Sequence, residues 1–163
     1  SMSGVRMSHT ACMLANGKVL VTGGYSGSAY LASTELYDPT LGTWATTGSM
    51  SFTREAITSA VLTNGKVLVA GGWNGVGLSA SELYDPSSGI WTTTTSMNAS
   101  RNQYIISITT NGAMLVAGGA GTLRTAELYY PLPSIWTISG SMNNGRQQHQ
   151  AVVLSNGKRL VAG

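Results

Sequence analysis

The sequence predicts an all-β protein built of small four-stranded antiparallel sheets that stack radially, and three observations support this fold class. Glycine supplies 21 of 163 residues and charged residues only 9%, a composition that excludes coiled coils, helical bundles and charged disordered tails. One sequence unit recurs at spacings of 48, 47 and 45 residues. Within each unit, short apolar runs alternate with Asn-Gly, Gly-Gly and proline turns, which is typical of strands. Because one such sheet cannot bury both of its faces, radial stacking of the copies is expected.

The repeating unit is defined by four markers. Asn-Gly begins the most regular stretch, at Asn16, Asn64, Asn111 and Asn156. The other markers are Arg6, Arg54, Arg101 and Arg146; Glu35, Glu82 and Glu127; and Trp44, Trp91 and Trp136. Arginine precedes asparagine by 10 residues in every copy, whereas the interval from Gly-Gly to glutamate varies as 11, 10 and 8. Each repeat is therefore a constant frame with one adjustable loop, in a single repeat region divided as 1–48, 49–95, 96–140 and a truncated 141–163.

Each complete repeat is expected to form four strands. The eight residues after each arginine form the first strand, at 7–14, 55–62, 102–109 and 147–154. Asn-Gly then forms a hairpin turn, because both residues tolerate the positive φ of a type I′ turn. Gly-Gly ends the second strand where neighbouring backbone is expected to pack closely. The third strand is expected at 34–39, 81–86 and 126–131, and the fourth surrounds each tryptophan.

The order Arg, Asn-Gly, Gly-Gly, Glu-x-Tyr-Asp-Pro and Trp resembles the Kelch repeat, and the resemblance extends over the whole chain. It implies a β-propeller of four-stranded antiparallel blades, of which this chain supplies about three and a half where the family usually has six or seven. Two departures are Tyr130, where the other copies have Asp38 and Asp85, and the end of the fourth copy at Gly163. Since open blade faces and strand edges are seldom left in water, we expect a homo-oligomer such as a dimer, or part of a longer propeller.

The recurring arginines are the first candidate binding residues. Arg54, Arg101 and Arg146 begin the innermost strand of their repeats, so we expect them near one mouth of the central channel, where they would attract an acidic peptide or a carboxylate. The resemblance supports this site, because arginines at this position bind acidic peptide motifs in some Kelch propellers. The alternative is that each arginine brackets a loop by bonding to backbone carbonyls.

The variable loops at 25–33, 73–81 and 120–126 are the second candidate site. In a four-stranded meander, the loops between the second and third strands open on the same side as the connections from one sheet to the next. Aromatic side chains on glycine-rich loops are a common binding composition. The candidates are Tyr25, Tyr30, Trp73, Asn74 and Arg124. The alternative for Tyr25 and Trp73 is that they cap the ends of the blades.

Other recurring side chains have structural interpretations. The tryptophans recur in strict register with Tyr37, Tyr84 and Tyr129, so we expect them to pack one blade against the next. Three residues after each arginine stand His9, Ile57, Tyr104 and His149. This chemical variety favours an unconstrained channel lining over a metal site.

The function that these features favour is a non-catalytic binding or scaffold module, with a protein or acidic peptide as partner and no cofactor. The first alternative is a galactose-oxidase-like or carbohydrate-binding propeller, but such a copper site needs several His and Tyr ligands and a Tyr-Cys crosslink, and this chain has two His and one Cys. The second is a fragment that serves only assembly. A net charge of +3 from scattered residues argues against nucleic acid, and no run of 18 apolar residues predicts a membrane span. Nothing in the sequence indicates a compartment.

Overall fold

The computed structural model describes residues 1–121, 123–153 and 159–162, with side chains described as far as residue 149. Within these ranges the regular structure consists of strands, and no helix there is long and apolar enough to cross a membrane. The first sheet contains β1 (Thr10–Met13), β2 (Val19–Thr22), β3 (Thr34–Asp38) and β4 (Thr43–Thr47). The second contains β5 (Thr58–Val61), β6 (Val67–Ala70), β7 (Ser81–Asp85) and β8 (Ile90–Thr94). The third contains β9 (Ile105–Ile108), β10 (Met114–Ala117), β11 (Thr125–Tyr130) and β12 (Ile135–Ser141). A two-stranded sheet follows, made of β13 (Gln150–Val153) and β14 (Arg159–Ala162).

Each four-stranded sheet is an antiparallel meander with its strands in chain order. The registers repeat with the sequence markers: Val21 pairs with Glu35 in the first sheet, and Val69 pairs with Glu82 in the second. The third sheet differs by a register shift between Thr125 and Glu127, where β11 meets β12. The all-β prediction is confirmed, and three four-stranded antiparallel sheets are consistent with a partial β-propeller.

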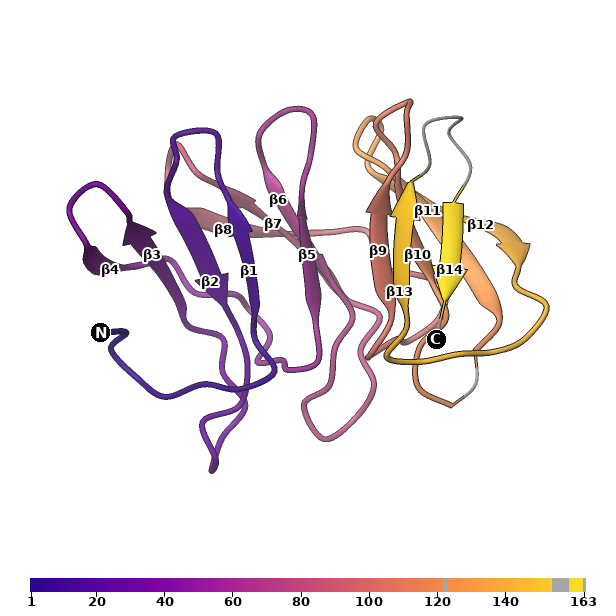
Figure 1. Cartoon of the computed structure of the whole chain (residues 1–163), viewed down its shortest axis with the longest axis horizontal. Helices are drawn as coiled ribbons and strands as arrows, with labels where there is room; N and C mark the ends of the chain where they lie inside the picture. The colour runs from indigo at the N-terminus through magenta and orange to yellow at the C-terminus, as the bar shows by residue number, and fades with distance from the viewer. Residues whose placement is uncertain (122, 154–158, 163) are drawn as a thin grey trace.

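The sheets stack through their first strands. Successive first strands contact one another, β1 with β5, β5 with β9, and β9 with β13. Figure 1 shows these four strands side by side across the middle of the molecule, with the later strands of each sheet leading away from them. The strand that follows each arginine is therefore the innermost one, as the repeat predicts.

The Asn-Gly hairpins form as predicted, but their turn type is different. In the first hairpin, the Leu14 amide donates to the Lys18 carbonyl at 2.8 Å, and the Gly17 amide donates to the Leu14 carbonyl at 2.9 Å. In the three Asn-Gly pairs that the structure describes, only the glycine has a positive φ, 79° at Gly17. This is a three-residue loop with glycine in the left-handed position rather than a two-residue type I′ turn. The Asn16 side chain accepts the Lys18 amide at 3.1 Å, which explains the asparagine in another way.

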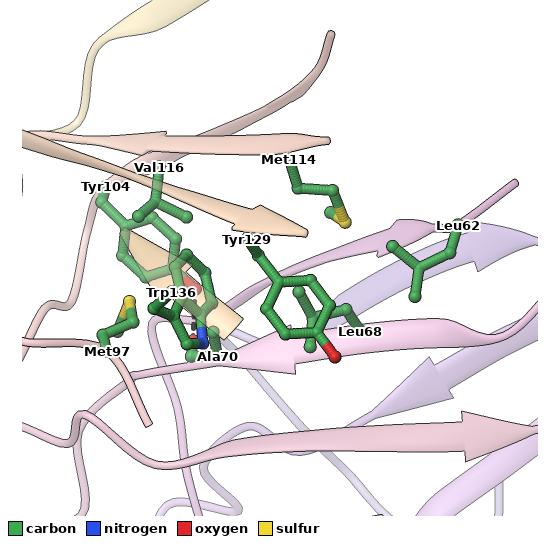
Figure 2. Close-up of a cluster of buried hydrophobic side chains, with 9 residues drawn as sticks. All are labelled: Leu62, Leu68, Ala70, Met97, Tyr104, Met114, Val116, Tyr129 and Trp136. Atoms are coloured by element: carbon green, nitrogen blue, oxygen red, sulfur yellow. Dashed lines mark hydrogen bonds between the residues drawn. The ribbon is translucent and has the colours of Figure 1, made fainter. Parts of the chain in front are cut away.

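The hydrophobic core lies between sheets. One cluster joins the second and third sheets, and Figure 2 shows Tyr129 of the third sheet beside Leu68 of the second, and Trp136 beside Ala70. An equivalent cluster joins the first and second sheets and includes Leu20, Val67 and Trp91. Each sheet thus buries a face only because a neighbouring sheet covers it.

The recurring tyrosines and tryptophans of the second and third sheets connect them to the preceding sheet, which confirms the predicted packing role for these two pairs. The Trp91 indole N–H donates to the Thr34 hydroxyl of the preceding sheet at 3.2 Å, and the Tyr84 hydroxyl lies 2.9 Å from the Thr47 hydroxyl. Within a sheet, the rings of Tyr84 and Trp91 are tilted, with centroids 5.2 Å apart. These hydroxyl and indole groups therefore find their partners on the preceding blade.

Candidate binding face

The loops expected to share one side of the molecule do so. Isolated backbone bridges join Met7 to Tyr25 and Glu55 to Trp73, so each segment that leads into a first strand pairs with a loop between second and third strands. These loops lie along the lower edge of Figure 1, opposite the Asn-Gly hairpins. We call this side the loop face. It is formed by residues 3–9, 23–33, 48–57, 71–80, 95–104, 118–121, 123–124 and 142–149.

The arginines occupy equivalent positions on the inner side of these loops. The carbonyl of Arg54 accepts the Gly24 amide at 2.8 Å, that of Arg101 accepts the Gly72 amide at 2.7 Å, and that of Arg146 accepts the Gly119 amide at 3.0 Å. Each arginine backbone is therefore hydrogen-bonded to the Gly-Gly pair of the preceding repeat. The arrangement explains the glycines: a Cβ at Gly23 would lie 2.6 Å from the Arg54 carbonyl oxygen, closer than packing allows.

The guanidinium groups of Arg54 and Arg101 point into the protein. Arg54 is 0% exposed, and it donates to the Gly71 carbonyl at 2.6 Å, the Ala80 carbonyl at 2.8 Å and the Glu82 carboxylate at 2.9 Å. Arg101 repeats this pattern with the carbonyls of Gly118 and Thr125 and the carboxylate of Glu127. Both guanidinium groups are thus neutralised and sequestered from solvent.

The expectation that Arg54 and Arg101 attract an acidic ligand therefore needs correction. A buried guanidinium that already bonds to a carboxylate and two carbonyls cannot meet a ligand without breaking those bonds. The alternative, that each arginine brackets a loop through backbone carbonyls, is what these two residues do. Arg146 is half-buried, so it is not displayed as an exposed charge either.

The recurring glutamates also hold the loop face in place. Glu127 accepts hydrogen bonds from the backbone amides of Asn98 at 2.6 Å and Ala99 at 3.1 Å, in addition to its pair with Arg101. Burial alone would raise the pKa of Glu127, but these hydrogen bonds and the arginine outweigh it and hold that pKa below its ordinary value. Glu35 shows the same balance with Ser3 and Arg6. These carboxylates are ionised clamps that fix the segment leading into each first strand.

The aromatic candidates lie at the surface of the loop face. Tyr25 and Tyr30 lie together, with ring centroids 5.2 Å apart, and both are half-buried. Trp73 is 37% exposed. Asn74 is half-buried, and its backbone N–H donates to the Val76 carbonyl at 3.2 Å. Arg124 is exposed. The structure thus brings the two tyrosines together and leaves Trp73 on a separate part of the loop face.

A cleft of about 330 Å³ opens between the second and third sheets on this face. Its lining consists of Glu55, Ala56, Trp73, Asn102, Gln103 and Ala120. Of these residues only Trp73 was a predicted binding residue. A signal for Glu55 and Asn102 was present in the repeat, because the position after each arginine holds Met7, Glu55, Asn102 and Gln147 and therefore does not follow the common frame.

The position three residues after each arginine is a packing site rather than an unconstrained lining, except in the first repeat, where His9 is exposed. Ile57, Tyr104 and His149 are buried. A side chain at Gly72 would collide with Ile57, and the Tyr104 hydroxyl donates to the Ala70 carbonyl. Burial lowers the pKa of His149. In the part of the chain that the structure describes, no three His, Cys, Asp or Glu side chains group to hold a metal ion.

Comparison with known families agrees with the arrangement of arginines, glycine pairs and stacked sheets. A model of the Kelch motif matches residues 6–51 and 58–98, which is more than half of the chain. The chain belongs to the Kelch-repeat family. A search of curated proteins found no match. Kelch repeats generally mediate binding between proteins and are generally non-catalytic, so the loop face is the natural place to look for a binding role.

Proposed function

We propose that this Kelch-repeat chain is a non-catalytic module that binds a segment of a partner protein on its loop face. The observation that carries the proposal is the exposed Trp73 beside the cleft between the second and third sheets. Partly exposed aromatic rings next to a concave surface supply much of the energy in protein interfaces, because a large rigid area is buried at small entropic cost.

The binding residues in this proposal are Trp73, Asn74, Tyr25, Tyr30 and Arg124. Arg54 and Arg101 are left out because they are buried and paired. The preference for an acidic peptide, which depended on those arginines, is withdrawn with them. No observation favours the galactose-oxidase-like or carbohydrate-binding alternative.

To test the proposal, peptides that bind to the whole chain are selected from a random displayed peptide library. Selected peptides are then measured against Trp73→Ala and Tyr30→Ala. The matched control is Leu41→Ala, since Leu41 is 72% exposed and lies in the turn between β3 and β4, away from the loop face. We expect at least about tenfold weaker binding for Trp73→Ala and no change for Leu41→Ala. Equal binding by all of these variants would remove the proposal.

A further inference from the structure

Glu55 differs from every other acidic residue in the chain. There are six aspartates and glutamates. Five of them form ion pairs, Glu35 with Arg6, Asp38 with Lys18, Glu82 with Arg54, Asp85 with Lys66, and Glu127 with Arg101. Glu55 has no cationic partner among the residues that the structure describes. It is half-buried and lines the cleft of the loop face.

The cleft exists because the third repeat lacks an aromatic side chain. Trp73 and Ala120 are structural counterparts, since each follows the Gly-Gly pair and each donates its amide, at 2.9 Å, to the carbonyl of the residue after the arginine. That carbonyl belongs to Glu55 in the second repeat and to Asn102 in the third. Tyr25 occupies the same position in the first repeat. Of these three repeats, only the third has a methyl group at this position, and the space beside it is the cleft.

The lining of the cleft matches a positively charged side chain. The Glu55 carboxylate supplies an uncompensated negative charge, and the Trp73 indole supplies an aromatic face that attracts cations. Asn102 and Gln103 carry amide oxygens that accept hydrogen bonds. The nearby guanidinium groups of Arg54 and Arg101 are neutralised by Glu82 and Glu127, so they do not cancel the charge of Glu55.

The size of the cleft favours a single side chain. Its volume of about 330 Å³ is at the lower limit of pockets that hold small molecules. Arginine fits this chemistry better than lysine, because a planar guanidinium can stack on an indole while it donates hydrogen bonds to a carboxylate.

We propose that an arginine side chain of the partner protein occupies this cleft, with its guanidinium against Glu55 and Trp73. The inference rests on the proposed function and adds the chemical class of the residue that is recognised. It reverses the charge preference expected from the sequence, because Glu55 is the only charged residue among the described residues that line the cleft, whereas Arg54 and Arg101 are buried in ion pairs.

The probes are four capped peptides that differ at one central residue, which is arginine, citrulline, lysine or glutamate. Binding is followed by backbone NMR shifts of the whole chain. The arginine peptide is expected to shift Glu55, Trp73, Gln103 and Ala120 in a saturable way and to bind at least about tenfold more tightly than the citrulline peptide. Its affinity should decrease as salt is added, because salt screens exposed charges. The glutamate peptide should not bind.

Two variants test the named residues. Glu55→Gln removes the charge at nearly constant shape and should weaken binding of the arginine peptide about tenfold. The control Asp38→Asn makes the same change in net charge outside the loop face and should leave the affinity for that peptide unchanged. Ala120→Trp restores the aromatic residue of the other repeats and should block the cleft. Should Ala120→Trp fail to fold, the Glu55→Gln comparison decides alone.

Several results would overturn this inference. They are equal binding of the arginine and citrulline peptides, tighter binding of the lysine peptide than of the arginine peptide, full affinity in Glu55→Gln, or shifts at the cleft caused by simple sugars but not by arginine. The proposed function can hold even if the arginine assignment fails, and one result distinguishes the two. If library-selected peptides lose affinity in Trp73→Ala but contain no basic residue and ignore Glu55→Gln, the loop face is the binding site and only the arginine assignment is wrong.

Discussion

At the scale of single residues, the buried arginine–glutamate pair is the feature that organises each blade. Arg101 and Glu127 have side chains that are 0% and 1% exposed. Arg101 donates to the backbone carbonyls of Gly118 and Thr125, and Glu127 accepts from the backbone amides of Asn98 and Ala99. A buried ion pair of this kind costs free energy to desolvate, so its main role is to specify where the loops lie.

Replacing Arg101 by methionine should lower the free energy of unfolding by about 3–5 kcal/mol, because Glu127 is left as a buried charge without a partner. Urea denaturation measures the effect. Lys66→Ala is the matched control, since it breaks the Lys66–Asp85 pair, whose side chains are 40% and 33% exposed, and should cost about 1 kcal/mol or less. Similar losses in the two variants would contradict the structural role assigned to Arg101.

The inward direction of these arginines was not predictable from the sequence alone. The spacing correctly placed Arg54 and Arg101 at the start of the innermost strands. The same spacing fits two arrangements, one with exposed guanidinium groups around the channel mouth and one with buried guanidinium groups bonded to loop carbonyls. The partner Glu82 lies 28 residues after Arg54, across the loop whose length varies between repeats. The position of Glu55 in a cleft was not predicted either, because that cleft depends on the small side chain of Ala120 in a different repeat.

At the scale of strands and turns, the repeat predicted most of the structure. Strand order and register follow from the markers, because Glu and Trp keep a constant separation on one hairpin. The predicted type I′ turn was wrong, because asparagine also favours turns without a positive φ, where its side chain accepts a hydrogen bond from the amide two residues on, as Asn16 does from Lys18.

The segments that lead into the first strands should loosen in acid. The pKa values of Glu35 and Glu127 are lowered in the folded chain, so below the ordinary glutamate value of 4.5 the unfolded chain binds protons that the folded chain resists. The stabilisation is therefore complete above that value and is lost as the pH falls through the folded pKa values. Urea denaturation between about pH 6 and about pH 3 should show this loss, and Glu127→Gln should flatten it. A free energy of unfolding that does not change over this interval would contradict the clamp role.

At the scale of the whole molecule, the first blade exposes a face that the others bury. Tyr84 and Tyr129 are 0% exposed beneath a neighbouring blade. Their counterpart Tyr37 and its neighbour Trp44 are only half-buried, and their ring centroids are 5.0 Å apart. Among the described residues, no blade covers this aromatic pair.

We expect this chain to self-associate through that face, since exposed aromatic surface of this kind is normally covered. Light scattering over a range of concentrations should show a mass above 16.9 kDa. Trp44→Glu should reduce the association, because it places a charge where a blade would pack. A soluble monomer at high concentration would show that the open face is tolerated.

Hydrogen–deuterium exchange of the whole chain with a library-selected peptide shows directly whether a partner binds the loop face. We expect the peptide to slow exchange in residues 71–80 and 101–104, which border the cleft, and to leave exchange in the Asn-Gly turns at 14–18 and 62–66 unchanged. If only those turns, at the opposite side of the blades, were protected, the loop face would not be the binding site.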